Sequence, residues 1–186
     1  MAIYNTGSDA ANTAVRAFLT KVGEHYLGRS FNTGSGYGKN EWTRIRDELF
    51  NSRCAYCGAA GKLQIEHLAM FNRTEFGLHH PGNIVPCCKP CNKRQKKDDG
   101  TYMDWREHLE WTCNNNGDSD LHESRLAKIE QHIDDSQYPN LNENERHSIR
   151  VIANTLYENI KNELNQSLNM YKMLDEAFVQ SNENGE

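Results

Sequence analysis

The stretches CAYC at residues 54–57 and CKPC at residues 88–91 decide the fold of this 186-residue chain. Each contains two cysteines separated by two residues, a spacing that lets both thiolates wrap around one tetrahedral ion. Two such pairs in one chain, here 30 residues apart, complete a four-cysteine structural zinc site. We therefore predict a structural Zn2+ whose ligands are Cys54, Cys57, Cys88 and Cys91.

Other uses of these cysteines fit the chain less well. A disulfide framework belongs to oxidising compartments, and we expect no signal peptide because the start, MAIYNT, lacks basic and apolar stretches. A redox pair needs only one C-x-x-C in a thioredoxin-like context. Inert buried thiols remain an alternative. We expect Cys87 and Cys113 to be small buried side chains, with Cys87 also a possible competing ligand.

Composition and charge restrict the class of protein. No apolar run approaches the roughly 18 residues that a membrane span needs, so we expect a cytoplasmic protein with no membrane partner. The net charge of -5 conceals an uneven distribution, with a basic segment in residues 39–97 and an acidic one in residues 98–186. The basic segment is suited to binding phosphate backbones, although scattered solvated charge is the alternative.

Three regions follow from the pattern of apolar residues, which indicates a mostly helical α+β chain. We expect an N-terminal helical segment and Gly-rich loop in residues 1–40, with the loop over residues 28–40. The zinc-held core occupies residues 41–100, and a helical region occupies residues 101–186. Trp42, Trp105 and Trp111 are expected to anchor the core around the small zinc module.

Individual elements are predicted from periodicity and turn signals. Strands are expected at residues 62–67 and 83–86, and a helix is expected to begin near Cys88 and carry residues 92–97. The other predicted helices cover residues 8–27, 41–51, 101–113, 120–133 and 143–179. The last of these has an apolar row with a mean spacing of about 3.6 residues. That row indicates either packing on the body of the protein or a homodimer interface.

A second group of polar residues surrounds the cysteine pairs. Glu66 precedes His67 on a predicted strand, Asn83 opens the next strand, and Asn92 follows the last cysteine. A carboxylate and an amide oxygen can hold a hard divalent cation while leaving coordination sites open. A neutral histidine beside them can take a proton from water. The alternatives are a histidine satisfied in the core and an asparagine that caps a helix.

The combined pattern resembles the HNH nucleases of the ββα-metal type with a zinc-knuckle scaffold, over residues 42–97. The residues that carry the resemblance are Cys54, Cys57, Glu66, His67, Asn83, Cys88, Cys91 and Asn92. The family implies two strands and a helix around one catalytic metal, and hydrolysis of DNA phosphodiesters. By position, His67 is the general base, and Glu66 and Asn92 are ligands of a catalytic Mg2+ or Mn2+. Asn83 is the residue that fixes the loop between the strands and orients His67.

One position departs from the family, and several basic residues extend the resemblance. The family usually has Asp where this chain has Glu66, and the extra methylene moves the carboxylate. The loop over residues 71–81, which contains His79 and His80, either contacts DNA or covers the cysteine site. The candidates for contact with DNA phosphates are Arg73, Lys93, Arg94, Lys96 and Lys97.

Two classes of function are compatible with this sequence. The first is a metal-dependent endonuclease on double-stranded DNA, of a type II restriction-like kind or of a homing, phage or modification-dependent kind. The second is a non-enzymatic zinc module that binds nucleic acid or protein through a degenerate HNH site, an alternative that Glu66 favours. A two-fold homodimer would present one site to each DNA strand.

Overall fold

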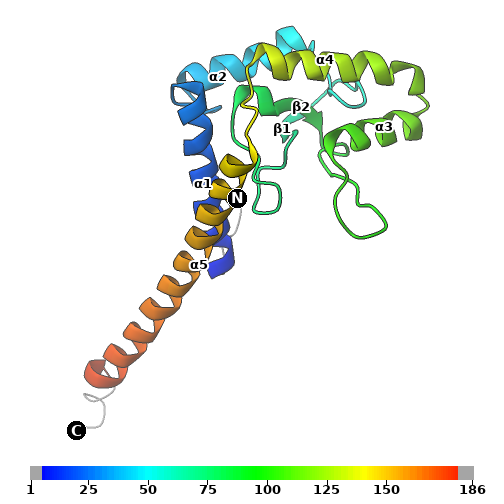
Figure 1. Cartoon of the computed structure of the whole chain (residues 1–186). Coiled ribbons are helices and arrows are strands. Elements are labelled where there is room, and N and C mark those ends of the chain that lie inside the picture. Colours follow the sequence, from blue (N-terminus) through cyan, green and yellow to red (C-terminus); the bar gives the residue numbers. More distant parts are fainter. Residues whose placement is uncertain (1–5, 180–186) are drawn as a thin grey trace.

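A two-stranded antiparallel sheet lies at the centre of this computed structural model, which describes residues 6–179. Figure 1 shows α2 and α4 above the sheet, α3 beside it, and α1 and α5 paired on the other side. A π-helical segment, Arg44–Leu49, continues α2, and another, Asp175–Val179, continues α5. The regular elements are α1 (Gly7–Leu27), α2 (Gly36–Thr43), β1 (Leu63–His67), β2 (Ile84–Cys88), α3 (Trp105–Asn116), α4 (His122–Asp135) and α5 (Glu143–Leu174).

Local capping signals set the ends of several helices. Helix α3 begins at a capping box formed by Asp104 and Glu107, and it ends at Gly117, whose φ is +75°. Helix α5 begins at a second capping box, formed by Asn142 and Glu145. Such boxes satisfy backbone N–H groups that have no partner within the helix. The predicted helices at residues 8–27, 101–113, 120–133 and 143–179 are therefore present, with small shifts at their ends.

The Gly-rich loop is shorter than predicted, because α2 begins at Gly36 inside it. Gly38 lies within α2, and a Cβ at this position would overlap the backbone of Asn32. This glycine therefore permits a close approach of two backbone segments. Its role is packing within a helix, whereas the sequence pattern had indicated a loop.

The two strands lie within one residue of their predicted starts, and their register brings the candidate site together. His67 pairs with Ile84, Glu66 pairs with Val85, and Leu63 pairs with Cys88. Strand β2 therefore runs into the second cysteine pair, two residues beyond the predicted end at residue 86.

The prediction of a helix that begins near Cys88 is wrong, because residues 89–104 form turns and an isolated bridge. Lys96 pairs with Tyr102, and the backbone N–H of Lys97 donates to the carbonyl of Thr101 at 2.8 Å. Gly100 closes the turn between them with a φ of +82°. The Asp-Asp-Gly sequence at residues 98–100 favours this tight turn over a helix.

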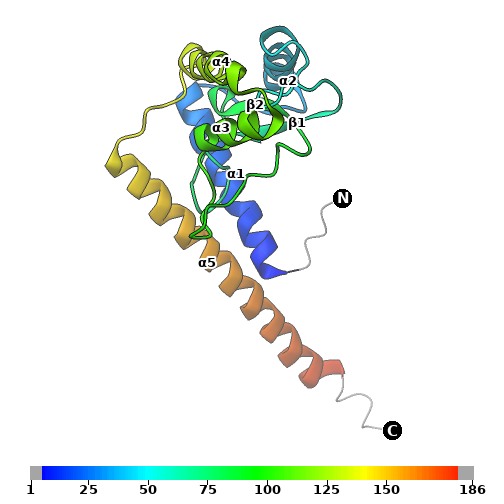
Figure 2. The same cartoon turned by 90° about the vertical axis from the view of Figure 1, so that its right-hand side faces the viewer.

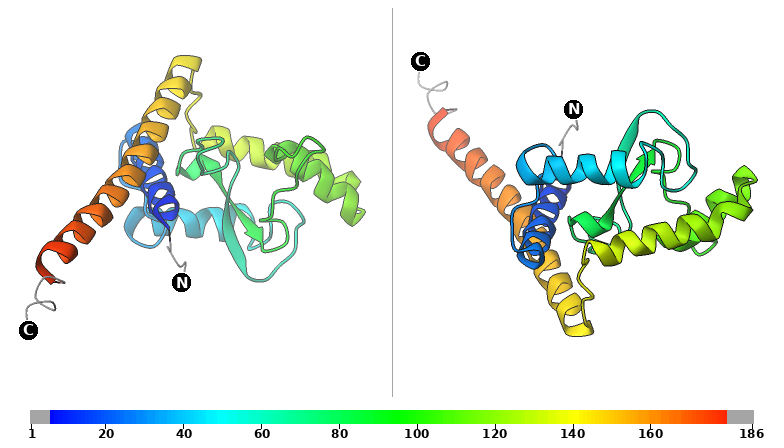
Figure 3. Two further views of the ribbon diagram at one scale, coloured as in Figure 1. Left: turned by 90° about the horizontal axis from the view of Figure 1, so that it is seen from below. Right: turned by 90° about the horizontal axis from the view of Figure 1, so that it is seen from above.

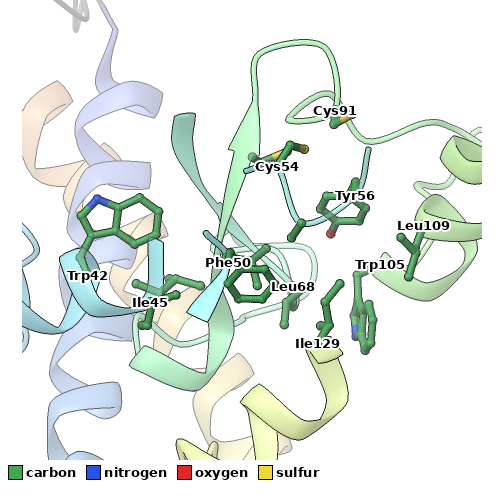
Figure 4. Packing of buried hydrophobic residues seen from close by; sticks show 14 of the residues in the cluster. Trp42, Ile45, Phe50, Cys54, Tyr56, Leu68, Cys91, Trp105, Leu109 and Ile129 are labelled. Atoms are coloured by element: carbon green, nitrogen blue, oxygen red, sulfur yellow. The ribbon is translucent and has the colours of Figure 1, made fainter. Parts of the chain in front are cut away.

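Two apolar clusters hold the fold together. The larger surrounds the first cysteine pair and joins the sheet to α2, α3 and α4 (Figure 4). Its central side chains are Trp42, Ile45, Phe50, Tyr56, Leu68, Trp105, Leu109 and Ile129. The smaller joins α1 to the first half of α5 through Val15, Leu19, Ile149 and Tyr157, among others. Trp42 and Trp105 are core anchors as predicted, whereas Trp111 is 39% exposed on α3.

Helix α5 extends well beyond the body of the protein, as Figures 2 and 3 show from three sides. Its buried face is formed by Ile149, Ala153 and Tyr157. The apolar row predicted for this helix begins Ile149, Ile152, Leu156 and Ile160, and of these Ile152 is 50% exposed. The predicted row therefore packs on the body of the protein in part, since Ile149 and Ile160 join the cluster with α1. Within residues 6–179, no helix has the length and apolar character needed to cross a membrane.

Candidate metal centre and catalytic pocket

The four cysteines of the two C-x-x-C pairs form one cluster. Their sulfur atoms all lie within 4.8 Å of one another, and the sulfurs of Cys57 and Cys88 are 3.6 Å apart. Four thiolates at about 2.3 Å around a tetrahedral Zn2+ would be separated by roughly 3.8 Å. The cluster is therefore positioned to bind a metal such as zinc. It is the one group of three or more His, Cys, Asp or Glu ligands found in the described part of the chain.

Backbone contacts hold the two pairs against each other. The N–H of Ala55 donates to the carbonyl of Pro86 on β2 at 2.8 Å, which attaches the first pair to the strand that leads into the second. The N–H of Asn92 donates to the carbonyl of Cys88 at 2.9 Å and turns the second pair. His108 of α3 places Nε2 2.9 Å from the carbonyl of Cys91.

Cys87 and Cys113 are fully buried, as predicted for cysteines outside the two pairs. Hydrogen bonds from the thiols of Cys87 and Cys91 lower the pKa of Cys54, whereas the pKa of Cys87 is raised. The thiolate form is therefore favoured at Cys54, and metal binding requires thiolates.

An open pocket of about 520 Å3 lies beside the cysteine cluster. It brings together five of the residues that sequence analysis singled out, and these come from the end of β1 and from the turn after β2. They are Glu66, His67, Asn92, Lys93 and Arg94. Arg16 lines the pocket from α1, and Phe71, Asn72 and Tyr102 line it from the loops.

Glu66 is paired inside the pocket with Arg94. The Arg94 Nη2 to Glu66 Oε1 distance is 2.6 Å, and the two side chains are 3% and 12% exposed, respectively. The same nitrogen donates to the carbonyls of His67 at 3.1 Å and Leu68 at 3.2 Å. Burial raises the pKa of Glu66, and the guanidinium opposes that rise. Arg94 is thus an internal partner of the carboxylate and the end of β1.

His67 contacts a second histidine. Its Nε2 lies 3.0 Å from Nδ1 of His79, and its ring stacks on Phe71 with centroids 4.7 Å apart. Burial, with a smaller contribution from His79, lowers the pKa of His67 to about 3. His67 is therefore neutral near pH 7 and has a free lone pair, but burial also makes it a weaker base than a solvated imidazole.

The two asparagines hold different parts of the site. Asn83 accepts from the N–H of Ala69 at 2.7 Å and donates to the carbonyls of Ala69 at 2.9 Å and Leu78 at 2.8 Å. It thereby joins both ends of the loop between the strands. Asn92 donates from Nδ2 to Gln64 at 3.0 Å, and no described residue donates to its Oδ1. Asn92 starts no helix, so the helix-cap alternative does not apply.

The five candidate DNA-binding cations are dispersed. Lys93 is exposed at the pocket, and Arg94 is buried in it. Arg73 lies 3.7 Å from the ring centroid of Tyr157 on α5, away from the pocket lining. Lys97 pairs with Glu107 at 2.7 Å, and Lys96 lies over the ring of Tyr102.

Arg16 and Tyr102 are pocket residues that sequence analysis did not identify. Arg16 is an exposed residue of α1, some fifty residues before Glu66, and nothing in its local sequence indicates a site. Only the packing of α1 against the loop between the strands brings it here. The contact of His79 with His67 was also not predicted, although the loop that carries His79 was a candidate for contact with DNA.

No protein-family model matches the chain, and comparisons with curated proteins and with solved structures gave no match either. Assignments at this site therefore rest on its residues and their geometry.

Two side chains that line the pocket carry oxygen donors of the type that binds a hard cation. Glu66 supplies a carboxylate, one oxygen of which is paired with Arg94, and Asn92 supplies an amide oxygen. Mg2+ is commonly held by one or two carboxylates together with waters and substrate phosphate. Two protein ligands would leave most of the coordination sphere open to such groups.

Proposed function

We propose that this protein is a metal-dependent endonuclease that hydrolyses phosphodiester bonds of double-stranded DNA at the pocket around Glu66 and His67. The observation that carries the proposal is the convergence of Glu66, His67 and Asn92 in one open pocket beside the four-cysteine cluster. The resemblance of these residues to the HNH pattern supports the reaction class. A type II restriction-like enzyme is the variety that we favour over a homing, phage or modification-dependent nuclease.

His67 performs the central step of the proposed reaction. Its neutral ring takes a proton from a water molecule, the water oxygen attacks phosphorus, and the bond from phosphorus to the leaving oxygen breaks. Asn83 fixes the loop that lies beside His67. Glu66 and Asn92 would hold a Mg2+ or Mn2+, which supplies stabilisation of the charge on the phosphate and leaving oxygens when bound.

Positive groups at the pocket are placed to receive the DNA backbone. Arg16 and Lys93 are exposed and line the pocket from α1 and from the turn after β2. Because phosphate contacts position a duplex without reading its sequence, these two residues are the phosphate contacts that we propose first. Arg94 is buried, and its part in the proposal is to hold the carboxylate of Glu66.

Cleavage of supercoiled plasmid in Mg2+ or Mn2+ tests the proposal. We expect the wild-type chain to nick or linearise the plasmid and His67→Ala to abolish cutting, because the base is gone. His147→Ala is the matched control, since this exposed histidine of α5 lies outside the pocket and should leave the rate unchanged. Equal cutting by His67→Ala and the wild-type chain would sink the mechanism.

A non-enzymatic zinc module that binds nucleic acid is the second candidate function. The 2.6 Å ion pair of Glu66 with Arg94 favours it, because the guanidinium competes with any metal for the carboxylate. A chain that binds duplex DNA but leaves plasmid intact in both Mg2+ and Mn2+ would establish this candidate.

A second copy of the chain is the partner that we propose for the extended part of α5. Leu164 lies against the first turn of α1, and beyond it Leu168, Tyr171 and Leu174 are at least half exposed. Between residues 159 and 174 the charged side chains are Lys161, Glu163 and Lys172, so like charges do not oppose self-association. Closed two-fold pairs are the commonest oligomers.

A further inference from the structure

The contact between His67 and His79 is built into the fold from several sides. The ring of His79 lies 4.9 Å from the centroid of Phe31 and 5.6 Å from that of Phe71. Its backbone is covered by α1, where a Cβ at Gly23 would overlap the carbonyl of His79. The ring of His79 is therefore enclosed by aromatic side chains and a helix.

A 3.0 Å contact between Nε2 of His67 and Nδ1 of His79 requires one donor and one acceptor. If His67 donates, its proton is on Nε2 and its Nδ1 carries a free lone pair. If His79 donates, the lone pair of His67 is on Nε2 and is occupied by the bond. Only the first arrangement leaves His67 able to accept a proton from outside the pair.

The surroundings of His67 Nδ1 are compatible with the first arrangement. No described residue hydrogen-bonds this nitrogen, and it is absent from the solvent-excluded polar atoms without a partner, which are Tyr56 Oη, Arg94 Nε and His108 Nδ1. His67 also lines the open pocket. Its Nδ1 is thus the ring nitrogen with access to pocket water.

We propose that His79 is a positioning residue, which accepts a hydrogen bond from Nε2–H of His67 and so keeps the Nδ1 lone pair directed at the pocket. This role rests on the proposed function, in which His67 is the base. His79 itself touches no reacting atom. Groups that fix the tautomer and orientation of a catalytic histidine commonly change rates without changing binding.

Two substitutions of His79 separate the hydrogen bond from the packing. His79→Asn places an amide oxygen near the position of Nδ1 and can still accept from His67. His79→Phe keeps a ring between Phe31 and Phe71 but has no acceptor. For plasmid cleavage we expect His79→Phe to lower kcat by about 10- to 100-fold. KM should not change, and His79→Asn should stay close to the wild-type kcat.

A second measurement needs no activity. A two-bond 1H–15N correlation spectrum of the full-length labelled protein reports which nitrogen of His67 carries the proton. We expect Nε2–H in the wild-type chain and in His79→Asn, and a mixture of tautomers in His79→Phe.

Two results would overturn the role of His79: an Nδ1–H tautomer of His67 in the wild-type chain, or wild-type kcat in folded His79→Phe. A wild-type chain that cuts no DNA would instead remove the proposed nuclease. The spectrum would then still decide the direction of the hydrogen bond, so the two failures are distinguishable.

Discussion

Arg94 shows how strongly one buried residue organises the candidate site. Its guanidinium neutralises Glu66 and binds the carbonyls of His67 and Leu68 at the end of β1. Removing one partner of a buried ion pair leaves an uncompensated charge, which costs about 3–5 kcal/mol. The pair therefore holds the site residues in place but makes the site sensitive to single substitutions.

We expect Arg94→Met to lower the free energy of unfolding by about 3–5 kcal/mol, measured by urea denaturation with zinc present. Glu66→Gln combined with Arg94→Met should lose less, because no buried charge remains. The surface pair of Arg46 and Asp47 is the control, since both side chains are 36% exposed, and Arg46→Ala should cost less than about 1 kcal/mol. A stability of Arg94→Met within 1 kcal/mol of the wild-type chain would contradict this account.

The cysteine cluster predicts that metal content and folding are coupled. The purified chain should contain about one zinc ion, and Cys57→Ser should lose it and unfold at a lower temperature, because binding energy of a structural site is folding energy. Cys113→Ser is the matched control, since Cys113 is buried and lies outside the cluster. Atomic absorption measures the zinc content of each chain. A folded wild-type chain without zinc would rule out a structural zinc at this cluster.

At the level of elements, the sequence predicts those features that are encoded locally. The capping box at Asn142 marks the start of α5 where it was predicted, and the cysteine spacing marks the metal cluster. The capping box at Asp104 was not predicted, and α3 begins four residues after the predicted start at residue 101. The structure after Cys88 could not be predicted from periodicity. Its path depends on Arg94 turning inward to reach Glu66, a contact across 28 residues, and on the turn at Gly100.

The residues of the candidate site divide in the same way, into those encoded by local motifs and those placed by long-range packing. Glu66, His67 and Asn92 follow from motif spacing, and the pairing of β1 with β2 brings them together. Arg16 and the pairing of His79 with His67 depend on how α1 packs, and no local pattern encodes that packing. Ala153 was not predicted as a contact residue of α5, because its small side chain adds little to a hydrophobic pattern.

Helix α1 contributes Arg16 to the pocket, which gives a prediction for DNA binding. Arg16→Ala should weaken binding to any duplex sequence and reduce the salt slope of log K by about 0.9, the value for one phosphate contact. Arg150→Ala is the control, because this exposed arginine of α5 lies outside the pocket. Fluorescence anisotropy over a salt series measures both slopes, and equal slopes for Arg16→Ala and the wild-type chain would exclude the contact.

At the scale of the whole molecule, the extended part of α5 predicts self-association. Light scattering should give twice the chain mass of 21.4 kDa for the wild-type protein. Replacing Leu168 and Tyr171 by Gln should give monomers that remain folded, because both side chains lie outside the two apolar clusters. A monomer mass for the wild-type chain, both free and bound to DNA, would remove the proposed dimer.

Cleavage by the purified chain tests the central claim, that the pocket around Glu66 and His67 hydrolyses DNA, most directly. The ends formed on a plasmid of known sequence in Mg2+ or Mn2+ should be mapped for the wild-type chain, His67→Ala and His147→Ala. We predict the same cleavage ends for the wild-type chain and His147→Ala, and none for folded His67→Ala. The same ends at the same rate from His67→Ala would contradict the account.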